Sequence, residues 1–187
     1  MDTVLKQFLD DADALGSTPD PVTLASLVGG FALDTEYWGH HIERAGEASV
    51  MLHHPDRGIQ VFLVRRTDGT MSYVHSHRVW VAMSAIVGVE THRHFHIHHL
   101  DDDRVTATLA EERHLHGGTG EAVTLMPPHD IHSHGHVRGT GDWPYTLIVL
   151  GDNFLRFERE EFDLREGRRR ILAPGDRGLP NLAEPVG

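Results

Sequence analysis

The feature that most constrains the fold is a change of texture near residue 48. From there the chain becomes a series of short runs rich in β-branched and aromatic residues, such as IQVFLVRR, VWVAMSAIV and YTLIVL. Turn residues such as Asp68-Gly69 and Gly139-Thr140-Gly141 separate these runs. Many short strands with turns at regular spacing are typical of an antiparallel sandwich or barrel. No alternation of strands with helices is visible, so we expect an all-β protein.

Two helical stretches precede the strands. Asp20 followed by Pro21 forms a good pair of N-cap and first-turn residues. We therefore expect two short helices within residues 1–45. Apolar residues recur at helical spacing in both stretches: Val4, Leu5, Phe8, Leu9, Ala12 and Leu15, then Leu24, Leu27, Val28 and Phe31.

The length of 187 residues favours a single domain with one sizeable core. Within it we expect a helical extension over residues 1–45, a β-barrel over 46–172 and a C-terminal arm over 173–187, where proline and glycine are frequent. By analogy with other barrels, the helices and the arm are candidates for holding a homodimer together.

Composition excludes several classes of function. Acidic residues outnumber Lys and Arg by 28 to 17, which argues against a nucleic-acid partner. The chain has no cysteine, so disulfides, thiolate nucleophiles and cysteine zinc sites are excluded. The start of the chain is too acidic for a signal peptide, and the longest nearly apolar run, Val79 to Val89, is far shorter than the roughly 20 residues of a membrane helix. We therefore expect a cytoplasmic protein with no membrane partner.

Histidine is the most unusual component, with 17 residues. On a strand, residues two apart project from the same face, so an H-x-H pair offers two imidazoles to one metal ion. Spacing alone does not choose among the pairs, which are His75/His77, the series His92, His94, His96 and His98, then His114/His116 and the series His132, His134 and His136.

Sequence context separates these histidines. Because Phe95 and Ile97 are the apolar members of their run, we expect the histidines of 92–98 to lie on the solvated face. His114 and His116 stand beside glutamates and a glycine-rich turn, which indicates the surface. The adjacent pairs cannot share a strand face and are expected in loops or at edges: His40/His41 and His53/His54.

Three histidines remain as the better metal-ligand candidates. His75 and His77 precede the most apolar segment of the chain, where a buried imidazole needs a partner, and a metal ion supplies one. His132 stands far downstream, where a turn leads back into a strand, and a closed barrel can bring such distant strands together. The competing interpretation is that they are core histidines hydrogen-bonded to the backbone.

Three segments resemble the cysteine dioxygenase-like (thiol dioxygenase) branch of the cupin superfamily: HSHRVWVAMSAIVGVETH (75–92), MPPHDIHSHGHV (126–137) and LGDNFLRFEREEFDLREGRR (150–169). The resemblance covers roughly residues 45 to 172. It implies the double-stranded β-helix (jelly-roll) fold, with Fe(II) held by His75, His77 and His132, and a dioxygenase that joins dioxygen to a small-molecule substrate. Many other cupins carry a glutamate where Val81 or Ala82 stands here, and its absence agrees with a three-histidine site.

The chain also departs from that branch. Thr146, Ile148 and Leu150 stand where cysteine dioxygenases carry a Ser-x-His-x-Tyr series, and the early run ASVMLHH lacks the arginine that holds an amino-acid carboxylate. Free cysteine is therefore not the expected substrate. We expect a more apolar pocket and a larger or less charged substrate. The residues expected to line this pocket are Tyr73, His134, Thr146, Ile148 and Leu150.

Two other functions stay open at the level of sequence. Imidazole ligands suit Zn, Ni, Cu or Mn as well as iron, so a cupin lyase, isomerase or hydrolase that uses the ion as a Lewis acid is the first alternative. The second is a non-catalytic metal-binding cupin, for which the stripe His92–His98 is the supporting feature.

Overall fold

Three helices open the chain in the computed structural model, which describes residues 2–46, 48–67, 69–101, 103–178, 182 and 183. They are α1 (Thr3–Ala14), α2 (Pro21–Ala32) and α3 (Thr35–Ala45). Each begins after an aspartate whose carboxylate accepts a hydrogen bond from a backbone N–H of the first turn: Asp2, Asp20 and Asp34. These caps satisfy donors that a helix start leaves free.

The third helix corrects the prediction of two. Trp38 of α3 is buried, and Tyr37, Ile42 and Ala45 pack partly buried against the same core. The Trp38 indole donates a 2.7 Å hydrogen bond to the carbonyl oxygen of Phe31, which ties α3 to the end of α2. His40 and His41 consequently lie on a helix and not in a loop or at a sheet edge.

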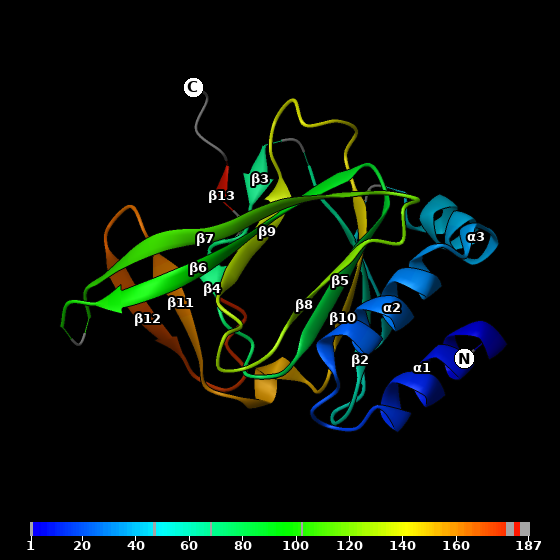
Figure 1. Ribbon diagram of the computed structural model, residues 1–187, viewed down its shortest axis with the longest axis horizontal. Helices are drawn as coiled ribbons and strands as arrows, with labels where there is room; N and C mark the ends of the chain where they lie inside the picture. Colours follow the sequence, from blue (N-terminus) through cyan, green and yellow to red (C-terminus); the bar gives the residue numbers. More distant parts are fainter. Residues whose placement is uncertain (1, 47, 68, 102, 179–181, 184–187) are drawn as a thin grey trace.

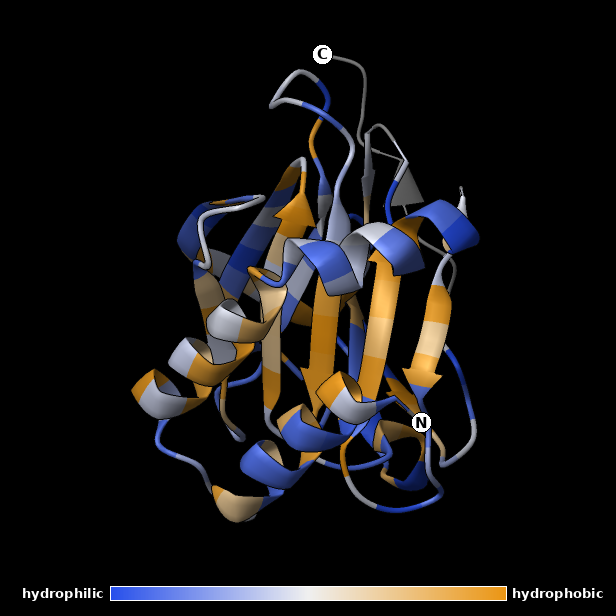
Figure 2. Ribbon diagram, turned by 90° about the vertical axis from the view of Figure 1, so that its right-hand side faces the viewer, coloured by the Kyte–Doolittle hydropathy of each residue, from blue (hydrophilic) through white to orange (hydrophobic). Residues whose placement is uncertain are grey.

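The strands form two antiparallel sheets, and a mostly-β architecture confirms the predicted class. Sheet A has the order β1-β2-β10-β5-β8, and helix α2 packs on β5 and β8 (Figure 1). Figure 2 shows that the strands beneath the helices are hydrophobic along most of their length. The bounds are β1 (Val50–His53), β2 (Gln60–Arg65), β5 (Val81–Val87), β8 (Ala122–Leu125) and β10 (Tyr145–Leu150).

Sheet A is apolar on both faces. Leu147 and Val149 of β10 pack against the helices, whereas Ile148 and Leu150 face the other way, into a second apolar cluster with Met83. A strand covered on both sides explains why YTLIVL is a continuous apolar run without alternation.

Sheet B has the order β12-β11-β4-β9-β3-β13, and β6 pairs with both β9 and β7. Its interior side is polar, because every residue of β9 is buried and this strand is rich in histidine. The bounds are β3 (Thr70–Met71), β4 (Val74–His75), β6 (Val89–His99), β7 (Val105–His116), β9 (His132–His136), β11 (Arg159–Asp163), β12 (Arg168–Leu172) and β13 (Leu182–Ala183). The jelly-roll connectivity of a cupin stays a prediction.

Strand β6 divides into two halves, and this corrects the expectation for its histidines. β6 pairs with β9 only through residues 91–94, and beyond them β6 and β7 continue as a two-stranded ribbon (Figure 1). In the ribbon His96 and His98 are exposed as predicted, but His92 is buried between strands. The prediction for His92 was wrong because the alternation of Phe95 and Ile97 describes only the second half.

The predicted C-terminal arm falls largely outside the described residues. Of residues 173–187, the structure describes 173–178, which are mostly exposed, and β13, which pairs with β3. Within the described part of the chain, no helix has both the length and the apolar character required to cross a membrane.

Candidate metal centre

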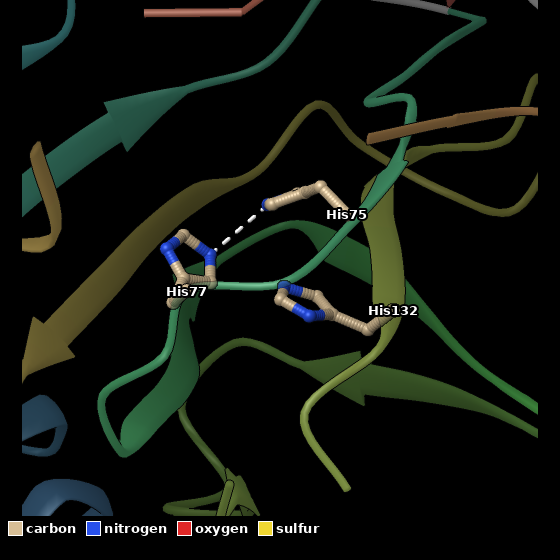
Figure 3. Close-up of side chains that lie close together, drawn as sticks. All are labelled: His75, His77 and His132. Atoms are coloured by element: carbon tan, nitrogen blue, oxygen red, sulfur yellow. Dashed lines mark hydrogen bonds between the residues drawn. The ribbon is translucent and has the colours of Figure 1, made fainter. Parts of the chain in front are cut away.

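Strand register brings two of the three predicted ligands together. His75 is the last residue of β4 and stands directly opposite His132, the first residue of β9. His77 follows two residues later in a loop. One ring nitrogen from each of these residues lies within 4.8 Å of the others, and Figure 3 shows the three rings gathered around one point. The Nε2 atoms of His75 and His77 are 3.0 Å apart.

The backbone fixes which nitrogen faces that point. Nδ1 of His75 lies 2.7 Å from the carbonyl oxygen of Tyr73, and Nδ1 of His132 lies 2.9 Å from the carbonyl oxygen of Asp130. Since a carbonyl only accepts, each Nδ1 carries the proton and each Nε2 keeps a lone pair. Nε2 of His132 is buried without a hydrogen-bond partner among the described residues. A buried lone pair without a donor is the state that a metal ion would satisfy.

Asp130 holds the loop that carries His77. One carboxylate oxygen of Asp130 accepts hydrogen bonds from the backbone N–H groups of His77 and Arg78, at 2.8 and 2.9 Å. Arg78 has a φ of 63°, a left-handed conformation that is uncommon outside glycine. The buried carboxylate stabilises this bend, so the same short segment supplies both the ligand His132 and the anchor of the ligand His77.

Burial keeps the three imidazoles neutral. Desolvation lowers the pKa of His75 to about 4, with Arg159 and Arg66 acting in the same direction. The pKa values of His77 and His132 are also well below the ordinary value, through burial first and neighbouring histidines next. Because only the unprotonated ring binds a metal ion, the group is ready to act as a ligand set at neutral pH.

A cavity of about 260 Å³ opens beside His75 and His77, and it corrects the prediction of an apolar pocket wall. Arginine side chains from three segments, Arg66, Arg159 and Arg177, reach it. Together these polar groups make the cavity cationic. Its lining residues are Arg66, Ser72, Tyr73, His75, His77, His134, Phe154, Arg159, Glu161, Leu172 and Arg177.

The other predicted pocket residues divide into two groups. Tyr73 and His134 line this cavity. Thr146, Ile148 and Leu150 do not line it: Ile148 and Leu150 pack in the apolar cluster of sheet A, and Thr146 is fully buried. A substrate contact by any of the five residues remains a prediction.

Thr146 belongs to a buried hydrogen-bond chain that ends at the cavity. Its hydroxyl donates to one carboxylate oxygen of Glu90 at 2.9 Å, and the other oxygen lies 2.8 Å from Nδ1 of His134. One guanidinium nitrogen of Arg66 lies 3.0 Å from Nδ1 and 3.1 Å from Nε2 of His134, and Nε2 is the acceptor because Nδ1 donates to Glu90. Burial raises the pKa of Glu90 to about 7, although Arg66 and Thr146 oppose the shift. This chain of hydrogen bonds therefore orients the guanidinium group of Arg66.

Sequence reasoning missed Arg66, Arg159, Glu90 and His92. A signal for Arg66 was present, because two consecutive arginines end the run IQVFLVRR and one of them must point inward. His92 lies under the centre: its ring stacks on that of His132 with centroids 5.3 Å apart, and burial lowers its pKa to about 3. Nothing in the local pattern distinguished Glu90 or Arg159 from solvated charge.

The fold and this site define a class: a mostly-β protein of two antiparallel sheets with a candidate centre for one metal ion, whose identity the donor set leaves open. The chain matches no family model and no curated protein. Among solved structures it is similar to a cupin-like protein from Thermotoga maritima, with 19% identity and a TM-score of 0.42 over 64% of this chain and 82% of the other.

Two further similar structures were found. The DMSP lyase DddQ from Ruegeria pomeroyi has 15% identity and a TM-score of 0.37, over 71% of this chain and 53% of the lyase. An RmlC-like cupin from Ralstonia eutropha has 14% identity and a TM-score of 0.35, over 66% of this chain and 64% of the other. This chain therefore spans about half of the lyase. At these scores the functional argument depends on the geometry of the site itself.

Proposed function

We propose that the chain is a cupin-type metalloenzyme in which His75, His77 and His132 hold one Fe(II) ion, and that it adds dioxygen to a small anionic molecule. The observation that carries the metal centre is the convergence of three ring nitrogens within 4.8 Å, two of them with the opposite Nδ1 held by a backbone carbonyl. The choice of dioxygenase chemistry is supported by the resemblance of residues 75–92 and 126–137 to thiol dioxygenases.

Three neutral ligands explain why this centre suits such chemistry. An ion held by His75, His77 and His132 would keep its full double charge and could bind an anionic substrate and dioxygen. The protein contributes the remainder. Arg66 and Arg159 attract and orient the anionic part of the substrate, and Tyr73 and Phe154 form the walls beside His75 and His77. His77 and His132 are buried and His75 is half-buried, which limits access of water.

Metal content tests the first half of the proposal. Full-length protein purified without added metal should contain about one ion per chain, and replacing His75 or His132 by Ala should remove it. His116→Ala is the matched control, since His116 is an exposed histidine outside the group and its loss should leave metal content unchanged. Equal metal content in all these proteins would refute the proposed centre.

Oxygen consumption tests the second half. The iron-loaded protein should consume dioxygen in an electrode chamber when it is given its substrate from a panel of small anionic thiols, diketones and carboxylic acids. Turnover of the same compound at an equal rate under strict anaerobiosis would overturn the dioxygenase. It would instead favour zinc or another ion acting as a Lewis acid at the same three histidines.

A further inference from the structure

Two buried arginines in the cavity have a donor that nothing uses. Arg66 is 8% exposed and Arg159 is 3% exposed, and both line the cavity beside the three histidines. The Nε–H of each is buried with no hydrogen-bond partner among the described residues. An unpaired donor on a buried charged group is costly, so two of them in one small cavity point to a ligand that satisfies both.

The two guanidinium groups are fixed from different sides of the cavity. Arg66 follows β2 and is held by His134 at the end of the Glu90 chain. Arg159 begins β11, donates to the carbonyl oxygen of Asp176, and lies over the ring of Phe154 with its central carbon 4.7 Å from the centroid. Each group therefore has its own anchors, and the two belong to separate elements of the fold.

Cationic side chains outnumber carboxylates in the lining of the cavity. Arg177 adds a third cation to the wall, and the histidines are neutral. The carboxylate in the lining, Glu161, forms a 3.0 Å ion pair with Arg170, which lies outside the cavity. Glu90 is buried behind His134 and does not line the cavity. A divalent ion would add two further positive charges.

We propose that this cavity binds a small dicarboxylate, with one carboxylate at Arg66 and the other at Arg159. A monocarboxylate could pair with only one of the two guanidinium groups, whereas a dicarboxylate could pair with both. The cavity volume of about 260 Å³ lies below the roughly 300–1,000 Å³ of drug-sized pockets, so the molecule is short. This inference depends on the proposed function only in placing the dicarboxylate beside a metal ion.

Calorimetric titration with matched pairs of acids tests the inference. Malonate and succinate should bind the full-length protein at least about tenfold more tightly than propionate and butyrate at equal ionic strength, because each charge-assisted pair contributes that much or more. Inorganic phosphate, added as a separate titrant, should bind more weakly than succinate. Equal affinities for succinate and butyrate, or tighter binding of phosphate, would overturn the proposal.

Variants assign the preference to the two arginines. Arg66→Gln and Arg159→Gln should each reduce the preference for succinate over butyrate to less than about threefold. Arg57→Gln removes the same charge from an exposed position outside the cavity and should retain the full preference. A preference that survives in both cavity variants contradicts the assignment. Arg66→Lys, which keeps the charge, provides a second measurement if Arg66→Gln fails to fold by circular dichroism.

A metal-free arm separates this inference from the proposed function. The same titrations on chelator-treated protein, and on the His75→Ala/His132→Ala double variant, should still show tighter binding of succinate than of butyrate. If the unaltered protein binds no metal but shows the preference, the dicarboxylate site is supported and the metal centre is refuted. A loaded metal centre without the preference would do the reverse.

Discussion

At the scale of single residues, burial separates histidines that the sequence presents as equals. His132 and His134 differ in role although they are neighbours on one strand face: one keeps a free Nε2 beside His75, and the other is held between Glu90 and Arg66. The difference comes from which partner reaches each Nδ1, a backbone carbonyl or a carboxylate. A ring's second nitrogen, more than its position in an H-x-H series, determines its function.

Glu90 is a residue whose loss should cost considerable stability. Glu90→Ala would leave the Thr146 hydroxyl, Nδ1 of His134 and the buried charge of Arg66 without their partner. We expect the free energy of unfolding to fall by roughly 3 kcal/mol or more, because an uncompensated buried charge has about this cost. Urea titration followed by circular dichroism measures the change.

Two comparisons make the Glu90 result specific. Glu90→Gln keeps the shape and one of the two acceptor oxygens, so its loss should be smaller than that of the alanine variant. Glu166→Ala removes an exposed carboxylate and should change the unfolding free energy by no more than about 0.5 kcal/mol. A loss for Glu90→Ala as small as for Glu166→Ala would contradict the buried chain described above.

At the scale of elements, the loop between β4 and β5 depends on Asp130, a residue just before the neighbouring strand β9. Asp130→Ala removes the acceptor of two backbone N–H groups that hold His77 and the bend at Arg78. We expect affinity for zinc, measured by competition with a coloured chelator, to fall about 10–100-fold, as is usual when the support of a ligand is removed.

The Asp130 prediction has two internal controls. Asp130→Asn retains an oxygen acceptor and should lose less affinity than the alanine variant. Asp56→Ala removes an exposed aspartate outside the metal centre and should leave the affinity for zinc unchanged. Equal zinc affinity in Asp130→Ala and Asp56→Ala would show that metal binding does not need the hydrogen bonds from Asp130 to the loop.

Elements were predicted from the sequence wherever one periodicity determined them. The strands followed from short β-branched runs between turn residues, α1 and α2 from helical spacing, and His75 and His77 from their apolar context. α3 was missed because its few apolar residues stand among histidines and charged residues, and His92 because one strand has two environments. Arg66 and Arg159 became cavity residues only through the pairing of strands that no local pattern reveals.

At the scale of the whole molecule, the buried histidines make stability depend on pH. Burial lowers the pKa of His75 to about 4 and that of His92 to about 3, and lowers those of His77, His132 and His134 as well. Below the ordinary value near 6.5 the unfolded chain takes up protons that the folded chain rejects. Folding free energy is therefore lost as the pH falls from about 6.5 towards 4.

Glu90 has the opposite effect on the pH dependence of stability, but it is one group against several buried histidines. Its pKa is raised by burial to about 7, so the folded chain retains a proton that the unfolded chain releases above about 4.5, and stability falls as the pH rises through this window. Each proton changes stability by about 1.4 kcal/mol per pH unit. Several histidines against one carboxyl leave a net loss on acidification, with a maximum of stability near neutral pH.

Unfolding of metal-free protein between pH 4 and 7.5 measures this balance. We expect the urea midpoint to decrease steadily below pH 6.5, and we expect added zinc to raise it at pH 7.5 but not at pH 4.5, where protons compete for the ligands. A midpoint that is constant from pH 7 to pH 5 would contradict the burial of these rings. His116→Ala, which removes an exposed histidine, should follow the same profile as the unaltered chain.

The pairing of His75 with His132 across β4 and β9 has a kinetic consequence. Because these two residues are distant in the chain, the ligand set is incomplete until β4 and β9 have paired. The ion would therefore bind after the rate-limiting step of folding. Metal loading would then slow the loss of the native state without hastening its formation. In a cell short of the ion, the protein would fold at its ordinary rate, but its native state would have a shorter lifetime.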